Sequence, residues 1–313
     1  MAGKKQAKKQ RKKAVRRRFS GALGAVMLVI FLLGGFFAWM AGSAHVTRLR
    51  YAQVYLEDLP AAFDGTTLLF ISDVDIRNAA DSAASVKLMK KLNELNVDML
   101  LLGGDYTTDS ALEIISGTEA DHSENAAEFI ASLAGFSAPL GKFAVAGEED
   151  NAQVLGSMFA LSGVQLLADA CATVNRDGTR LVIAGLSDVS EKKTPYEQIG
   201  GYFTGDECVI ALAHNPSAYV GVRVSEARGG GAWADMVLAG HTLGGQIRIG
   251  NRTIRTMPEE EARCIAGWYY EDDLPMLVSQ GLGCKAAKLR LGTRSEVWHI
   301  TLRKPQARTL PKL

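Results

Sequence analysis

Five short apolar runs in the sequence each end on a carboxylate or a histidine. The runs cover 68–73, 99–105, 143–148, 209–214 and 236–241, and they end on Asp73, Asp105, Glu148, His214 and His241. Near-continuous apolar runs of this length are typical of strands that are buried on both faces of a sheet. Because ligands bind beyond the carboxyl ends of strands in open α/β sheets, we expect these five side chains to converge on one site. Their types are those that hold divalent metal ions.

Helices and hairpins are predicted between and after these runs. Apolar residues recur at helical spacing over 82–96, and the stretches 124–133 and 151–161 each end close to a glycine, so we expect three helices there. Asp177-Gly178 and Gly250-Asn251 each separate two strand-like segments, as in β-hairpins. Further strands are predicted at 46–53, 276–280 and 296–302. Mixed parallel and antiparallel strands with helices outside indicate an α/β fold of two packed sheets covered by helices on both sides.

The amino-terminal region predicts a membrane anchor. Residues 1–18 contain ten Lys or Arg and no acid, and residues 19–44 contain no charged side chain. As a helix, 19–44 would span roughly 35–40 Å at about 1.5 Å per residue, enough to cross a bilayer. The basic segment is expected to stay cytoplasmic, which would place a domain at 45–302 outside and leave 303–313 as a flexible tail. Small residues at 41–44 keep a cleaved signal peptide open as the alternative.

Charge and cysteine content narrow the class of protein further. Beyond the basic segment, the remaining 25 Lys and Arg residues stand against 34 Asp and Glu residues, so the domain is acidic and nucleic acid is not expected as a partner. The four cysteines are widely spaced and form no CxxC pair. Because a domain of this size does not need disulfides, we expect small buried thiols.

In their order along the chain, the strand-end motifs resemble those of the calcineurin-like metallophosphoesterases, within them the membrane-anchored bacterial branch. The motifs are Asp73-Val74-Asp75, Gly103-Gly104-Asp105, Gly147-Glu148-Glu149-Asp150, His214-Asn215-Pro216 and Gly240-His241-Thr242-Leu243. The resemblance runs from about Tyr55 to Leu302. It implies a four-layer α/β/β/α sandwich of two mixed sheets, here preceded by one transmembrane helix. It also implies hydrolysis of a phosphoric mono- or diester outside the cytoplasmic membrane, through a hydroxide that bridges two divalent metal ions.

Residue by residue, the resemblance assigns Asp73 to the first metal, Asp105 as the bridging ligand, and His214 and His241 to the second metal. Four positions depart from the family pattern. Asp75 stands for a metal-binding His, Glu148 for Asn, Glu149 for the His that assists the leaving group, and Leu243 for the last metal-binding His. Carboxylates still bind metal, so the expected ligands are Asp73, Asp75, Asp105, Glu148, His214 and His241. Glu149 is the candidate catalytic proton donor, whereas Leu243 cannot bind metal.

These departures concentrate negative charge at the site. Six carboxylates would lie together: Asp73, Asp75, Asp105, Glu148, Glu149 and Asp150. Like charges raise one another's pKa, and even two divalent ions leave the cluster net negative, so we expect slower hydrolysis than in an intact family member. The oxygen-rich ligand set favours one or two Mn²⁺ or Mg²⁺ ions.

Three functional interpretations remain open. The first is a working hydrolase whose phosphoester substrate belongs to a lipid or another cell-envelope component. The second is a catalytically silent protein of the same fold that serves as a membrane-anchored binding or scaffolding module. In the third, the acids and histidines are caps and surface groups that bind no metal.

Overall fold

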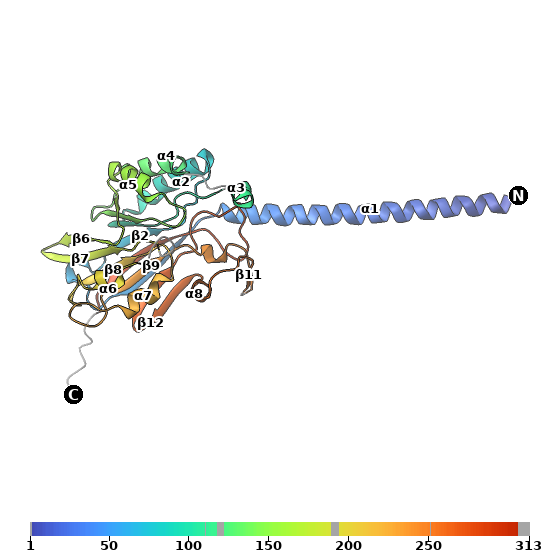
Figure 1. The fold of residues 1–313 in the computed structure, drawn as a ribbon. Helices are drawn as coiled ribbons and strands as arrows, with labels where there is room; N and C mark the ends of the chain where they lie inside the picture. The colour runs from blue at the N-terminus through green and yellow to red at the C-terminus, as the bar shows by residue number, and fades with distance from the viewer. Residues whose placement is uncertain (1, 110, 118–121, 189–193, 251, 306–313) are drawn as a thin grey trace, which may run out of the picture.

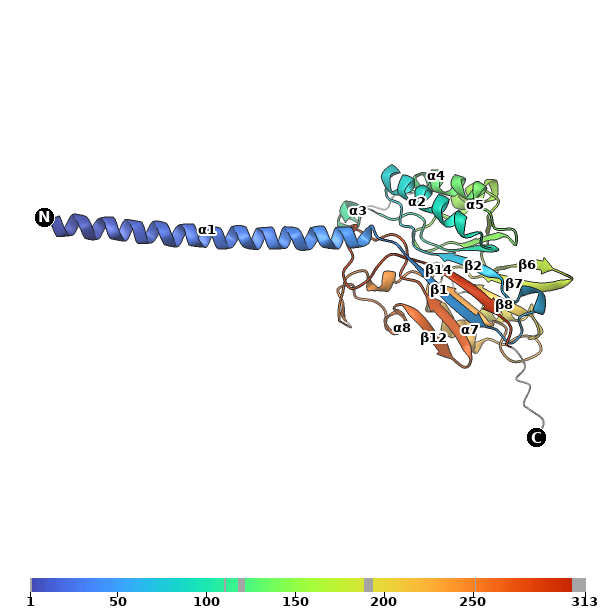
Figure 2. The same ribbon diagram turned by 180° about the vertical axis from the view of Figure 1, so that it is seen from behind.

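The computed structural model describes residues 2–109, 111–117, 122–188, 194–250 and 252–305, in which two six-stranded mixed sheets pack together (Figures 1 and 2). The first sheet has the order β1-β14-β2-β3-β4-β5. Its strands are β1 (Arg48–Tyr55), β14 (Glu296–Arg303), β2 (Thr67–Ile71), β3 (Met99–Gly103), β4 (Lys142–Val145) and β5 (Gln165–Leu166). The last four strands of this order are parallel to one another, whereas β14 runs antiparallel to β2.

The second sheet has the order β12-β13-β9-β8-β7-β6. Its strands are β12 (Gly267–Glu271), β13 (Leu274–Val278), β9 (Met236–Ala239), β8 (Cys208–Leu212), β7 (Thr179–Gly185) and β6 (Ala170–Arg176). Its four central strands are parallel, and β12 and β6 pair antiparallel at the two edges. A separate two-stranded ribbon consists of β10 (Arg248–Ile249) and β11 (Arg252–Thr253).

Helices cover the outer faces of both sheets. The helices are α1 (Ala2–Ala44), α2 (Ala79–Leu92), α3 (Ala111–Ser116), α4 (Ala127–Ser132), α5 (Ala152–Leu161), α6 (Tyr196–Gly200), α7 (Ala218–Val224) and α8 (Glu259–Arg263). Side chains of α2, α4 and α5 pack on the first sheet, and those of α6 and α7 pack on the second. The predicted four-layer α/β/β/α sandwich is therefore confirmed.

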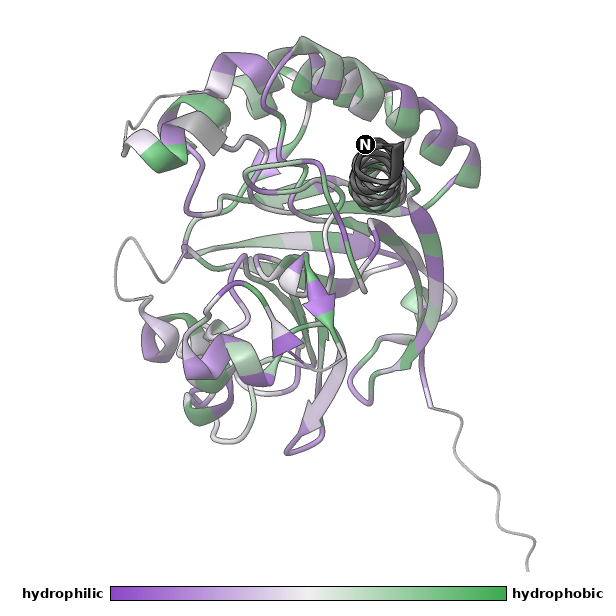
Figure 3. Cartoon of the chain, turned by 90° about the vertical axis from the view of Figure 1, so that its right-hand side faces the viewer, coloured by the Kyte–Doolittle hydropathy of each residue, from purple (hydrophilic) through white to green (hydrophobic). Residues whose placement is uncertain are grey.

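The apolar runs alternate between two cores, which explains why they contain almost no polar residue. In β2, Leu68 and Phe70 belong to the core between the sheets, whereas Leu69 and Ile71 belong to the core beneath α2, α4 and α5. All four side chains are fully buried. Figure 3 shows the strands as largely hydrophobic and the outer helices as mixed. A strand buried on both faces cannot alternate with polar residues, as expected from the sequence.

Helix positions differ from the predictions at their amino ends. The helix predicted at 82–96 begins at Ala79, because the side chain of Asn78 caps it by accepting hydrogen bonds from Ala80 N and Asp81 N at 3.0 and 3.1 Å. The helix predicted at 124–133 is helical as α4 from Ala127 only, after a 3₁₀ turn. The prediction at 151–161 is confirmed, with Asn151 as the cap.

Both predicted hairpins form. Of the two predicted closing strands, β14 begins at Glu296 as expected, whereas β13 begins at Leu274, two residues before the predicted start. All four cysteines are free, and Cys208 and Cys284 are buried. β14 continues to Arg303, and the predicted tail lies beyond the described residues from 306 onward.

One continuous helix, α1, includes both the basic segment and the apolar segment. Its portion Leu23–Ala44 is long and apolar enough to cross a membrane, with a mean hydropathy of 2.3, and projects away from the domain (Figures 1 and 2). The division of the chain into a basic cytoplasmic segment (1–18), a transmembrane helix (19–44), a domain (45–302) and a flexible tail (303–313) stays a prediction.

The end of α1 lies at the same edge of the first sheet as the strand ends that carry the motifs. β1 runs parallel to β14 and therefore antiparallel to β2, so the start of β1 at Arg48 lies near the carboxyl end of β2. Met40 and Ala44 are buried against the domain. Helix α1 consequently leaves the domain at the edge where β2, β3 and β4 have their carboxyl ends.

Candidate metal centre

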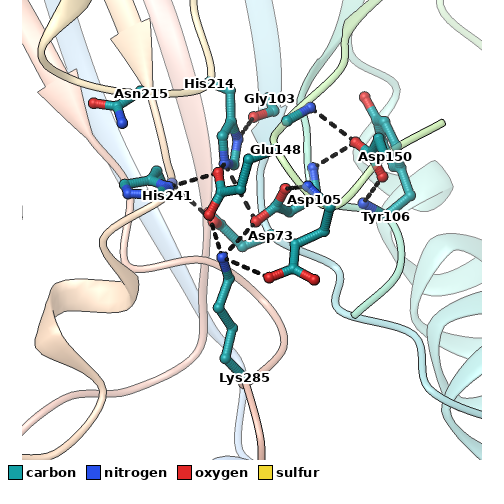
Figure 4. A network of polar contacts seen from close by, with 12 residues as sticks. Asp73, Gly103, Asp105, Tyr106, Glu148, Asp150, His214, Asn215, His241 and Lys285 are labelled. Carbon is teal, nitrogen blue, oxygen red and sulfur yellow. Dashed lines mark hydrogen bonds and ion pairs between the residues drawn. The ribbon is translucent and has the colours of Figure 1, made fainter. Parts of the chain in front are cut away.

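The five strand-end residues meet at one place in the structure. Asp105, Glu148, His214 and His241 offer ligand atoms that all lie within 4.8 Å of one another. Asp73 lies beside them, because its Oδ1 accepts a hydrogen bond from His241 N at 2.8 Å. These residues follow β3, β4, β8, β9 and β2, so both sheets contribute to the site (Figure 4). The predicted convergence is what the structure shows, whereas the role of each residue as a ligand stays a prediction.

The backbone turns sharply where these residues leave their strands. Asp73, Asp75, Asp105 and His241 all have positive φ angles, of 50°, 51°, 52° and 68°. Such angles are uncommon for residues with a side chain and cluster at functional sites. Gly104, with φ of 87°, also allows close approach, because a Cβ there would lie 2.7 Å from His214 Nδ1. The strand ends are therefore shaped to bring the side chains together.

Each histidine is oriented by a second acceptor. His214 Nδ1 lies 2.7 Å from the carbonyl oxygen of Gly103, and His241 Nε2 lies 3.1 Å from Glu261 Oε2. The opposite ring nitrogens face Glu148 Oε2 at 2.9 Å for His214 and 2.8 Å for His241. Metal-binding histidines are held in this way, with one nitrogen fixed by an acceptor and the other directed inward. Glu261, on α8, was not predicted as part of the site.

Several buried carboxylate oxygens have no hydrogen-bond donor among the described residues. They are Asp73 Oδ2 and both oxygens of Asp75, whereas Asp105 Oδ2 has only the nitrogens of His214 and Lys285 nearby, at 3.3 and 3.1 Å. All three side chains are at most 1% exposed. A buried carboxylate without a donor is costly, and a divalent cation is the partner that such oxygens commonly take. Together with two oriented imidazoles, these residues fit a divalent metal site.

The pKa shifts of the site residues are those expected of a site that binds cations. Burial, followed by the charges of Asp73 and Asp105, raises the pKa of Asp75 well above its usual value. Burial opposes protonation of His241, yet hydrogen bonds to Glu148 and Glu261 outweigh it and raise the pKa of His241 to about 9. Burial also acts on Asp105, but the charges of His214 and Lys285 outweigh it and lower the pKa of Asp105, so this acid stays ionised whereas Asp75 favours its protonated form.

Lys285 is a further member of the site that was not predicted. Its Nζ lies 3.1 Å from Asp105 Oδ2 and 3.2 Å from Glu149 Oε1, and it also forms an ion pair with Glu148 Oε1 (Figure 4). It comes from the segment between β13 and β14. No motif in the sequence marks this lysine, because 137 residues separate it from Glu148.

The two departures that most weaken the family pattern also have defined positions. Leu243 is 1% exposed, and its carbonyl oxygen accepts a hydrogen bond from the buried Arg290. Glu149 is only partly buried, and its backbone N donates to Asp105 Oδ1 at 3.3 Å. Burial raises the pKa of Glu149, although the charge of Lys285 opposes the increase.

A cavity of about 480 Å³ opens beside these residues. Its lining combines Glu148, Glu149 and Lys285 with the apolar side chains Ile114, Leu243, Ile247 and Ile254. Arg255, Thr242 and Gln246 also line the cavity, so a molecule in it would contact charged and polar side chains as well as apolar ones.

Sequence relatives carry related names. The chain is 23% identical over 299 residues to an uncharacterized metallophosphoesterase, YkuE, of Bacillus subtilis, covering 93% of this chain and 99% of the relative. It is 24% identical over 295 residues to the phosphodiesterase YaeI of Escherichia coli, covering 92% and 98%. A Danio rerio transmembrane protein with a metallophosphoesterase domain is 24% identical over 279 residues, which cover 84% of this chain but 59% of that protein.

No family model matches the chain. Among solved structures, a dimetal phosphatase from Danio rerio superposes with a TM-score of 0.42 at 10% identity, covering 70% of this chain and 88% of that one.

Proposed function

The chain belongs to the calcineurin-like metallophosphoesterase family, and we propose that it hydrolyses a phosphoric mono- or diester outside the cytoplasmic membrane. The observation that carries this proposal is the group formed by Asp105, Glu148, His214 and His241, whose ligand atoms lie within 4.8 Å of one another. Mn²⁺ and Mg²⁺ suit the oxygen-rich ligand set.

The described residues divide the chemical tasks between them. Asp73, Asp75, Asp105, Glu148, His214 and His241 would hold the divalent metal. A bound ion would supply Lewis-acid stabilisation of the phosphoryl oxygens and lower the pKa of a coordinated water. Glu149 is partly exposed and lines the cavity, and in this proposal its carboxyl group would protonate a leaving oxygen. Its raised pKa supports this role, and an unchanged pH–rate profile of Glu149→Gln would exclude it.

The position of the anchor supports a substrate at the membrane surface. Two carbonyl oxygens near the end of α1 accept hydrogen bonds from the segment before β14: Met40 O from Arg290 N at 3.3 Å and Ala44 O from Ser295 Oγ at 3.2 Å. This is the segment that carries Lys285. The strand ends that form the site therefore lie on the side of the domain that a membrane-embedded α1 would bring toward the lipid.

Exposed isoleucines on the same side give this surface an apolar rim. Ile114 and Ile115 on α3 are 51% and 83% exposed, and Ile249 and Ile254 at the β10–β11 ribbon are 67% and 70% exposed. Figure 1 shows α3 and β11 on the side of the domain from which α1 projects. Apolar side chains at this position suit contact with acyl chains, so we assign a lipid phosphoester as the substrate class.

Turnover of a soluble nitrophenyl phosphodiester with Mn²⁺ tests the hydrolase proposal. Asp105→Asn removes a carboxylate from the centre of the site and is expected to lower the rate at least 100-fold. Asp177→Asn, an exposed change in the β6–β7 turn, should leave the rate unchanged. Equal rates for the wild type and Asp105→Asn would contradict hydrolysis at this site.

The lipid assignment has its own test. Ile115→Ser should lower the rate on a phospholipid in vesicles several-fold without changing the rate on the soluble diester. Equal effects on both substrates would contradict contact between the isoleucine rim and lipid.

Leu243 and Glu149 favour the second candidate, a silent binding module of the same fold. This candidate predicts no turnover by the wild type and a gain of turnover when Glu149→His and Leu243→His restore the family pattern.

A further inference from the structure

Asp105 and Glu148 each contact Lys285 on one side and at least one histidine on the other. Asp105 Oδ2 lies 3.3 Å from His214 Nε2 and 3.1 Å from Lys285 Nζ. Glu148 turns Oε2 toward both histidines and pairs through Oε1 with Lys285. Figure 4 shows the two imidazoles on one side of the acids and the ammonium group on another. Lys285 thus contacts the same carboxylate, Asp105, that the family resemblance makes the bridge between two metal ions.

We propose that the Lys285 ammonium group takes the place of one of the two metal ions, so that the site binds a single divalent cation. The ion that remains would lie on the histidine side, among Asp105, Glu148, His214 and His241. This inference rests on the proposed function only in requiring that the site binds metal, and it does not depend on turnover.

The loss of a ligand on the other side supports this assignment. Leu243, which stands where the family has its last metal-binding histidine, is buried and apolar. The cations whose charges act on the neighbouring Asp75 are instead Lys285 and Arg290. A position that has lost an imidazole and gained a fixed positive charge is poorly suited to a second divalent ion.

Lys285 is held in place by its backbone rather than reaching in from a mobile surface. Its N–H donates to Gln246 Oε1 at 3.0 Å, and Gln246 Nε2 donates to the carbonyl oxygens of Lys285, Ala287 and Leu289 at 3.0, 3.1 and 3.2 Å. Gly283 N donates to Asp73 O at 2.6 Å. The Lys285 side chain is 14% exposed. The ammonium group is therefore a built part of the site.

Removing the charge should create room and ligands for a second ion. Asp73 Oδ2 and both oxygens of Asp75 have no donor among the described residues, and Asp105 Oδ2 would lose its ion pair with Lys285. Four carboxylate oxygens would then be available beside the histidine-side ion. Hard oxygen ligands of this kind suit Mn²⁺.

The experiment counts bound manganese. The full chain in detergent micelles is equilibrated with Mn²⁺, dialysed, and analysed by elemental mass spectrometry and by electron paramagnetic resonance, which separates isolated from coupled Mn²⁺ ions. The wild type should bind one ion per chain, and Lys285→Met should bind two, with a spin-coupled spectrum. Lys285→Arg, which keeps the charge, should bind one.

Lys288→Met is the matched control, because Lys288 lies in the same segment as Lys285 but pairs with Asp81 of α2. This variant should bind one ion. If Lys285→Met does not fold, Lys285→Gln takes its place. Two ions in the wild type, or one ion in both wild type and Lys285→Met or →Gln, would overturn the role of Lys285. No manganese in any of these chains would instead contradict metal binding, and with it the proposed function.

Discussion

Arg290 joins the loops that carry the site, and replacing it tests how firmly they are held. The side chain is fully buried and donates to the carbonyl oxygens of Leu243, Gln280, Gly281 and Gly283, at distances of 2.6–3.3 Å. Leu243 lies two residues after His241, and Gly283 lies two residues before Lys285. A guanidinium fork suits this task because its fixed donors meet several acceptors at once.

Arg290→Met should destabilise the domain substantially. Hydrogen bonds that involve a charged donor contribute about 1.5–3 kcal/mol each, and a buried acceptor left without a donor costs about 1–3 kcal/mol. Because the loops would relax and admit water, we expect a total loss of about 3–5 kcal/mol, within the 5–15 kcal/mol of a typical domain. Arg290→Lys keeps the charge but not the fork, so about half of this loss is expected.

Urea unfolding of the full chain in micelles measures the effect, with fluorescence of the buried Trp233 and Trp298 as the signal. Arg263→Met is the control, because Arg263 forms an exposed pair with Glu259 and should contribute less than about 1 kcal/mol. A loss below about 1 kcal/mol for Arg290→Met would refute the view that this arginine joins the loops.

Two further predictions concern packing and pH. Gly147→Ala should lower Mn²⁺ affinity at least 10-fold in a calorimetric titration, because the new Cβ would lie 2.8 Å from His214 Nε2. Gly135→Ala is the control and should leave the affinity unchanged, because its Cβ would meet no atom within 4 Å. Burial, with a contribution from Asp58, raises the pKa of Asp235 to about 7. Since its unfolded value is about 3.9, the folded state binds the proton more tightly and stability should fall as pH rises from about 4 to about 7. Asp235→Asn should lose this dependence when urea midpoints at pH 4 and pH 8 are compared, and an equal pH dependence in both chains would contradict it.

The elements that the sequence predicted best are those whose environment is set by neighbours on both sides. β2 and β3 could be predicted because a strand between two layers must be apolar at every position, and the polar residue that follows must then lie at the sheet edge. The start of α2 was misplaced by three residues because the signal is a single capping residue, Asn78, before the apolar recurrence begins.

The part of the site that escaped prediction depends on contacts between distant segments. Glu148 and His241 could be predicted as site residues because each of them ends an apolar run. Lys285, Arg290 and Glu261 follow no such run, and the motif residues that Lys285 and Arg290 contact, Glu148 and Leu243, lie 137 and 47 residues away. A lysine in a loop is ordinarily solvated, and only the folded arrangement shows that this one faces three carboxylates.

The departures from the family pattern and the buried cations offset one another electrostatically. Asp75, Glu148 and Glu149 each replace a neutral ligand or proton donor by an acid, which would leave the site strongly negative. Lys285 pairs with Glu148 and Glu149, and its charge, together with that of Arg290, acts on Asp75. Glu148 and Glu149 therefore each have a fixed positive partner, whereas both oxygens of Asp75 lack a donor among the described residues. Because one ammonium group cannot neutralise all three added acids, the site keeps an excess of negative charge that attracts a divalent cation.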